Sequence, residues 1–145
     1  GNILLIGVTG YLGIHILQEL LENENSKIYV IIRKEPGMTI EQKLLDKMHY
    51  YFGEKYDKYI GERIIIFQGD MTLDGFGLQQ EDLFNVGNSV TTIINSAAKV
   101  SHYGNYQEFY NVNVKSVEKI IDFAKTFNCK VFHISTLSIS GNAFF

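Results

Sequence analysis

The sequence predicts an α/β fold in which a parallel sheet is wound with helices on both faces. Short apolar runs alternate with longer amphipathic segments from end to end of the chain, and the first apolar run stops at a glycine-rich turn. Strands that are buried on both faces consist almost entirely of apolar residues, because neither face meets water. Alternation of such strands with helices therefore indicates a doubly wound parallel sheet.

The residue pattern places each element in order. β-Branched and aromatic residues gather in the expected strands, which are Ile3–Ile6, Lys27–Ile32, Arg63–Phe67, Val90–Ile94 and Lys130–Ile134. Apolar residues recur at helical spacing in the expected helices, which are Leu12–Leu21, Thr39–Phe52, Gln79–Val86 and Asn105–Phe127. We expect these elements to form one domain, residues 1–145, with the sheet truncated after its fifth strand.

Composition excludes several classes of function. The 145 residues carry a net charge of -3 with scattered Lys and Arg, so no basic stripe for nucleic acid is present. Apolar runs are too short for a membrane span, and we expect no signal peptide before the first strand. Cys129 is the sole cysteine and no Cys and His cluster has metal spacing, which predicts no metal site and a cytoplasmic protein.

Three glycines between the first strand and the first helix give the strongest signal of chemistry. Gly7, Gly10 and Gly13 form a GxxGxxG pattern, with one residue more between the first two glycines than the usual GxGxxG. In dinucleotide-binding folds such glycines permit a tight turn and let the backbone and the helix N-terminus approach the pyrophosphate. The position after a buried strand favours this Rossmann-type interpretation over a purely structural turn.

A cation follows the second strand, at the place where a carboxylate usually binds the adenosine ribose. Arg33 stands there, and Lys34 is next to it. An arginine can bind the 2′-phosphate of NADP(H) bidentately, and Lys34 could assist. The alternative interpretation is a solvated charge at a strand end.

Small and polar residues follow the later strands. Asp70 could accept a hydrogen bond from the adenine amino group while Met71 packs on the ring, although an Asp after glycine is also an ordinary turn residue. Ala97 and Ala98 leave room for ribose and nicotinamide, or simply allow close packing.

Asn113 is a poor helix-interior residue, and Thr136 is one of several hydroxyl residues that face the ligand crevice or act as local caps.

Taken together, these segments resemble the extended short-chain dehydrogenase/reductase superfamily. The closest branch is the terminal thioester reductase domain of nonribosomal peptide synthetases and the related carboxylic acid reductases, a male-sterility-type NAD-binding domain. The resemblance covers essentially the whole chain. It is carried by GVTGYLGIHIL, VIIRK, FQGDM, NSAAKV, YNVNVKSVEKIIDFAK and HISTLSISG.

The resemblance implies a role for each matching residue. The residues that would line the pyrophosphate are Gly7, Thr9, Gly10, Tyr11, Leu12 and Gly13. The other implied cofactor contacts are Arg33 with Lys34 at the 2′-phosphate, Asp70 with Met71 at the adenine, and Ala97, Ala98 and Lys99 at the ribose and nicotinamide. Thr136 matches the catalytic Ser/Thr of the family, and Asn113 matches its helix Asn.

The implied activity is that of an NADPH-dependent reductase in a multidomain synthetase. It would transfer a hydride to an acyl or peptidyl thioester held on a carrier protein, and release an aldehyde or an alcohol. The catalytic Tyr and Lys of the family, four residues apart, come after the fifth strand, so we expect the 145-residue chain alone to be inactive. Tyr51 and Lys55 have that spacing but lie in the second helix, where we expect surface packing.

Three departures and two alternatives accompany this interpretation. Ile6 replaces a common Thr, Asn95 stands where the branch often has His, and Ser101 where it often has Asn. A nucleotide-sugar epimerase or dehydratase of the same superfamily is one alternative, which Arg33 disfavours because many such enzymes keep an acidic residue for NAD. The other is a non-catalytic NADP-binding sensor or scaffold domain.

Overall fold

The structure of the chain is a computed structural model that describes residues 1–97 and 106–134. The strands are β1 (Asn2–Ile6), β2 (Ile28–Ile32), β3 (Ile64–Gln68), β4 (Val90–Asn95) and β5 (Lys130–His133). The α-helices are α1 (Tyr11–Asn23), α2 (Ile40–Phe52), α3 (Gln80–Ser89) and α4 (Tyr106–Phe127). Two short 3-10 helices, η1 (Asp57–Tyr59) and η2 (Asp74–Gly77), flank β3.

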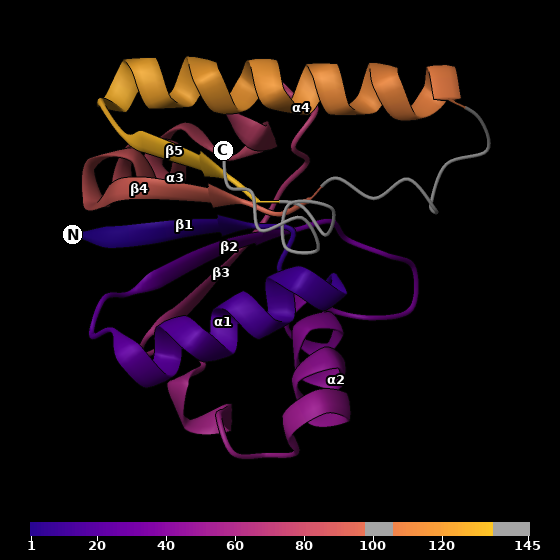
Figure 1. The fold of residues 1–145 in the computed structure, drawn as a ribbon, viewed down its shortest axis with the longest axis vertical. Helices are drawn as coiled ribbons and strands as arrows, with labels where there is room; N and C mark the ends of the chain where they lie inside the picture. The colour runs from indigo at the N-terminus through magenta and orange to yellow at the C-terminus, as the bar shows by residue number, and fades with distance from the viewer. Residues whose placement is uncertain (98–105, 135–145) are drawn as a thin grey trace.

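The strands form one parallel sheet in the order β3-β2-β1-β4-β5. Helices α1 and α2 lie on one side of the sheet, and α3 and α4 lie on the other, as Figure 1 shows. The predicted doubly wound α/β class is confirmed. Because the strand order reverses between β1 and β4, the crevice outside the carboxyl ends of these strands is where ligands of such sheets bind.

Side chains alternate between two apolar clusters, one on each face of the sheet. Leu5 of β1 belongs to the cluster that holds α1 and α2, whereas Leu4 and Ile6 belong to the cluster that holds α3 and α4. Successive residues of a strand point to opposite faces, so an unbroken apolar run fills both cores. This burial on both faces explains why the strands were recognisable in the sequence.

The predicted elements agree with the structure except at some ends. Lys27 and Arg63 precede β2 and β3 instead of opening them, and Ile134 follows β5. The carbonyls of Lys27 and Arg63 still accept ladder bonds from Ile3 and Ile28, at N to O distances of 3.0 and 2.7 Å. The η1 and η2 turns were not predicted. Among the described residues, no helix is long and apolar enough to cross a membrane.

The C-terminus of α1 is capped by Arg63, the residue just before β3. α1 has no basic residue in its last turn. Arg63 Nη1 donates to Leu21 O at 2.9 Å, and Nη2 donates to Glu24 O at 2.6 Å. The guanidinium also lies 5.2 Å from the ring centroid of Tyr59. A positive charge at this end of a helix also complements the helix dipole.

We predict that Arg63→Met lowers the free energy of unfolding by about 2 kcal/mol, because hydrogen bonds made by a charged donor are lost and carbonyls at the helix end lose their partner. Arg63→Lys should recover only part of the loss, since one ammonium cannot reach carbonyls that the guanidinium spans. Urea denaturation monitored by circular dichroism measures the change. Lys55→Met, which removes an exposed ion pair with Glu22, is the control and should change little. Equal stability of Arg63→Met and wild type would contradict the capping role.

Candidate functional site

Residues predicted for the site follow four neighbouring strands at one edge of the sheet. Gly7 follows β1, Arg33 follows β2, Asp70 lies just beyond β3, and Ala97 lies just beyond β4. All four strands are parallel. Their carboxyl ends therefore meet at the same edge of the sheet. The crevice where ligands of such sheets bind lies at this edge, between β1 and β4, where the strand order reverses.

Gly7 lets the end of β1 approach the end of β4. Its φ is +86°, a conformation that residues with a side chain rarely adopt. A Cβ at this position would lie 2.8 Å from both the N and the Cα of Ala97. The amide of Gly10 donates to Gly7 O at 3.1 Å and closes the turn. Gly7 thus satisfies both requirements, the left-handed backbone and the close approach.

Gly13 brings α1 against this turn. A Cβ there would fall inside van der Waals contact with Gly7 O and lie 2.9 Å from Val8 Cα. The N-cap of α1 is Gly10, no described side chain caps the helix, and its first turn contains no acidic residue. The first-turn N–H groups of a helix lack intrahelical partners and carry partial positive charge. This helix end is therefore suited to an anion.

The other residues of the motif differ in exposure. Gly10 is buried, Thr9 and Leu12 are half-buried, and Tyr11 is 63% exposed. The Tyr11 ring packs against His15, at a centroid distance of 4.5 Å, and against Tyr51, at 5.8 Å. Tyr11 is thus part of an aromatic cluster that covers the side of α1 next to the turn.

Tyr51 lies in α2, but Lys55 lies in the turn beyond the end of α2 and not in the helix as predicted, and the two residues have different neighbours. Tyr51 packs on Tyr11 and His15, whereas Lys55 Nζ lies 3.7 Å from Glu22 Oε1 near the other end of α1. Glu22 is the main cause that raises the pKa of Lys55 above its ordinary value. Because Tyr51 and Lys55 contact different neighbours, this geometry agrees with surface packing.

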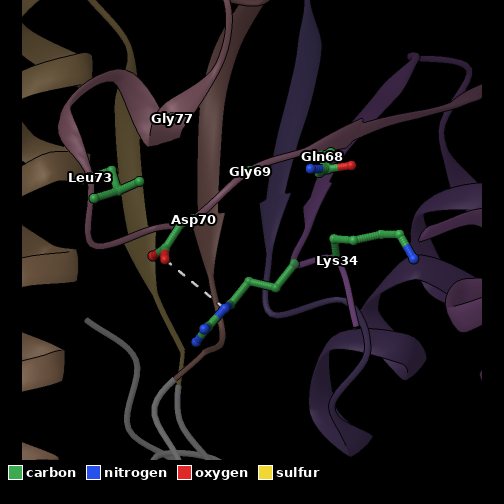
Figure 2. A pocket seen from close by; sticks show the side chains of 7 residues that line it. Lys34, Gln68, Gly69, Asp70, Leu73 and Gly77 are labelled. Atoms are coloured by element: carbon green, nitrogen blue, oxygen red, sulfur yellow. Dashed lines mark ion pairs between the residues drawn. The ribbon is translucent and has the colours of Figure 1, made fainter. Parts of the chain in front are cut away.

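A cavity of about 270 Å³ lies beyond the ends of β2 and β3 (Figure 2). Its lining consists of Arg33, Lys34, Gln68, Gly69, Asp70, Leu73 and Gly77. Arg33 Nε lies 4.0 Å from Asp70 Oδ2, and the Arg33 side chain is 76% exposed. A long and exposed ion pair of this kind is weak, so the guanidinium remains accessible to an anionic ligand.

Lys34 is directed differently from Arg33. Its Nζ donates to Glu35 O at 2.8 Å and also to Met38 O. Figure 2 shows the side chain extending away from Asp70. Lys34 therefore stabilises its own loop, and the two cations do not converge on one point in this structure.

The Asp70 carboxylate is held ionised by its own loop. Asp70 Oδ1 accepts hydrogen bonds from Thr72 N at 2.9 Å and from Thr72 Oγ1 at 2.6 Å. Burial acts to raise the pKa of Asp70, but the two bonds from Thr72 and the charge of Arg33 outweigh it and leave the pKa below its ordinary value. Oδ2, which faces Arg33, is the oxygen better placed to accept from a ligand.

Asn95 joins the ends of β4 and β5. Its Oδ1 accepts from Ala97 N at 3.1 Å, and its Nδ2 lies 3.1 Å from His133 Nδ1, which accepts in the neutral tautomer protonated on Nε2. Ser96 Oγ donates to Ile6 O at 2.8 Å and ties β4 to β1. The bridge between Asn95 and His133 was not predicted, because it depends on the register that pairs these two residues.

The remaining predicted residues are placed as follows. Met71 is half-buried and packs, like Ala97, against the apolar cluster below α4, and it does not line the cavity. Asn113 is half-buried in α4. Ala98, Lys99 and Thr136 lie outside the described residues, so their roles stay predictions.

Gln68, Leu73 and Gly77 line the cavity and were not predicted, although their closeness to Asp70 in the sequence was a usable signal. Within the part of the chain that the structure describes, no group of acidic, His or Cys side chains could hold a metal ion.

Comparisons with known proteins point to one family. The model of an NAD-binding family described as male sterility protein matches residues 5–144. The chain is 36% identical over 149 residues to probable polyketide synthase 44 of Dictyostelium discoideum. It is 37% identical to a thiolation-reductase di-domain from an archaeal non-ribosomal peptide synthetase, with a TM-score of 0.76, and 25% identical to the terminal R domain of the myxalamid PKS-NRPS pathway, with a TM-score of 0.78.

These relatives are much longer than the chain. The matches cover 95% of the chain but 5% of the polyketide synthase. They cover 96% of the chain and 29% of the archaeal di-domain chain, and 95% of the chain and 35% of the myxalamid domain chain. The resemblance to terminal reductase domains that the motifs predicted is confirmed.

We predict that the Asp70 carboxyl titrates below the ordinary value of about 3.9 in the folded chain. Because the folded pKa is depressed, the ionised group contributes stability that is present above the unfolded pKa and is lost as pH falls through the folded pKa. The difference in the free energy of unfolding between wild type and Asp70→Asn should therefore become smaller as the pH is lowered. A carboxyl-carbon NMR titration measures the midpoint, and Thr72→Val should raise it. A wild-type midpoint at or above the ordinary value would contradict the prediction.

Proposed function

Because the chain belongs to the NAD-binding family described as male sterility protein, we propose that it is the cofactor-binding part of a reductase that uses NADPH to reduce a thioester held on a carrier protein. The product is an aldehyde, or an alcohol after a second reduction. One observation carries the cofactor half of this proposal. The uncapped N-terminus of α1 and the exposed Arg33 lie at the same edge of the sheet, where a dinucleotide needs its pyrophosphate and adenosine partners.

The turn around Gly7 supports the pyrophosphate position. A side chain at Gly7 would collide with the backbone of Ala97, and a side chain at Gly13 would collide with Gly7 itself. Their absence lets α1 begin close to the turn after β1, no described side chain caps its first-turn N–H groups, and the helix dipole favours negative charge there. The residues present therefore fit a dinucleotide.

The choice of NADPH over NADH rests on Arg33. The carboxylate that would bind an unmodified ribose is replaced by this cation, and the guanidinium is exposed and only loosely paired with Asp70. Lys34 is bonded to the carbonyls of Glu35 and Met38, so we assign the 2′-phosphate to Arg33 alone. Asp70 is assigned to the adenine amino group through Oδ2.

The reducing chemistry is supplied by NADPH, which donates a hydride when it is bound. The chain's own residues hold and orient the two ends of the cofactor. Thr136 is proposed to donate a hydrogen bond to the oxygen of the thioester carbonyl as negative charge develops there. Asn113 of α4 is proposed to support that end of the site. Both assignments follow from the family resemblance.

The substrate half of the proposal rests on the relatives. One solved relative pairs a thiolation domain with a reductase domain, and another is the terminal domain of a mixed polyketide and peptide pathway. We propose the same setting here, a reductase domain in a multidomain synthetase that receives its acyl or peptidyl group from a carrier protein. Since the chain spans about a third of the solved relatives, this activity is assigned to the longer reductase.

We predict that Arg33→Ala weakens NADPH binding by about 10- to 100-fold, because a charge-assisted hydrogen bond contributes roughly 1.5–3 kcal/mol and 1.4 kcal/mol is a tenfold change. NADH lacks the 2′-phosphate and should hardly respond. Titration calorimetry of both cofactors measures the difference. Lys34→Ala is the matched control and should leave the preference for NADPH intact. Equal loss for both cofactors would assign Arg33 to the fold, and a wild-type preference for NADH would overturn the choice of NADPH.

We predict that Thr136→Ala in the longer reductase lowers turnover of a carrier-bound acyl thioester by about 10²–10³-fold, the scale of one oxyanion donor. Binding of NADPH should stay nearly unchanged, and Thr136→Ser should retain more activity. Stopped-flow absorbance of NADPH during a single turnover measures the rate. If Thr136→Ala reduces the thioester as fast as wild type does, the hydroxyl has no catalytic role.

A further inference from the structure

We propose that Phe76 is a positioning residue for the adenosine end of the cofactor, because it anchors in the core the loop that carries Asp70. The inference rests on the proposed cofactor function. The adenosine loop, residues 70–77, leaves the end of β3 and includes η2. It supplies Asp70, Leu73 and Gly77 to the lining of the cavity next to Arg33.

The backbone of Phe76 is strained. Its φ is 58° and its ψ is 21°, and the glycines on either side also have positive φ, 58° at Gly75 and 67° at Gly77. A bulky aromatic residue in the left-handed region is a genuine outlier, because its Cβ crowds the backbone. Such residues persist only where the surrounding structure determines them, and they gather at ligand-binding sites. The Phe76 side chain is 0% exposed, so burial of the ring offsets the strain.

The ring ties the loop to α4. It belongs to the apolar cluster below α3 and α4, and its centroid lies 5.2 Å from that of Phe123. A second tie joins Asp74 of the loop to Lys119 of α4 through a short ion pair. The loop is thus fastened to the helix on its core side while its other side faces the cavity.

The backbone of Phe76 in turn holds Asp70. Phe76 O accepts from Asp70 N at 2.8 Å, and Phe76 N donates to Leu73 O at 3.0 Å. A Cβ at Gly69 would lie 2.5 Å from Phe76 O, so the loop closes tightly against the end of β3. The anchored ring therefore fixes Asp70 and two walls of the cavity before a ligand arrives. A preformed site avoids the cost of ordering a loop on binding.

The test compares three variants with wild type. Phe76→Ala removes the ring, Phe76→Leu keeps an apolar anchor, and Val86→Ala removes volume from the same apolar cluster at a fully buried position of α3 outside the loop. Titration calorimetry measures the affinity for NADPH, NADH and adenosine 2′,5′-bisphosphate, which carries the adenosine end alone. Urea denaturation in parallel gives the stability of each variant and the conditions in which all are folded.

The expected result is a loss of affinity for all three ligands in Phe76→Ala, by about tenfold or more, the scale of one misplaced hydrogen bond at the adenine. Phe76→Leu should restore most of it. Val86→Ala should bind as wild type does although it is also destabilised. The equal loss for NADPH and NADH separates this role from that of Arg33, which reads only the 2′-phosphate.

Contrary outcomes separate the two proposals. If wild type binds neither NADPH nor NADH, the proposed cofactor function fails and the role of Phe76 fails with it. If wild type binds NADPH and Phe76→Ala binds it equally well, Phe76 is a core residue only and the cofactor function stands. Where Phe76→Ala does not fold, Phe76→Leu decides: a loss of affinity greater than that of Val86→Ala supports the positioning role, and a loss no greater than that of Val86→Ala overturns it.

Discussion

The close packing of α1 on the turn after β1, and of that turn on the end of β4, sets the geometry on which the candidate site depends. Gly7 and Gly13 remove the two Cβ atoms that would keep these backbones apart. The start of α1 consequently lies against the turn that follows β1, and that turn lies against Ala97. A side chain at Gly13 would push α1 away from this turn, and a side chain at Gly7 would push the turn away from Ala97. Either change would move the proposed phosphate-binding position. The remaining contacts of α1 with the sheet need apolar side chains, but many different apolar residues could make them.

The two apolar clusters hold different parts of the site. The cluster under α1 and α2 supports the turn between β1 and α1. Arg63, just before β3, caps the other end of α1. The cluster under α3 and α4 supports the adenosine loop through Phe76. β1 contributes to both clusters, because Leu5 faces one and Leu4 faces the other. The proposed phosphate turn and the adenosine loop are therefore held by separate cores on opposite faces of one sheet, and β2 contributes to both cores as β1 does.

Local patterns in the sequence were enough to predict the fold and to place the candidate site residues relative to its strands. Apolar runs, helical periodicity and the GxxGxxG turn each depend on residues close in the chain, and they located β1, α1 and the position of Arg33. Features that depend on distant residues were not predictable. The capping role of Arg63 requires the end of α1 to lie beside β3, and the bridge from Asn95 to His133 requires the register of β4 and β5. The left-handed backbone of Phe76 has no signal of its own, because a glycine-rich loop indicates flexibility and not a buried anchor.

Arg63 and Arg33 differ in how far the fold already uses their charge and their hydrogen-bond donors, and this difference supports the binding role proposed for Arg33. Arg63 donates to main-chain carbonyls at the end of α1 and stacks on Tyr59, so its charge and its donors are used within the fold. Arg33 has a long contact with a carboxylate that Thr72 already stabilises, and most of its side chain is exposed. Replacing a weak, solvated ion pair by a phosphate costs little desolvation, since the guanidinium is not buried beforehand. The free energy of the proposed bidentate contact at Arg33 would therefore be available for binding, whereas a new contact at Arg63 would first have to offset the loss of a helix cap.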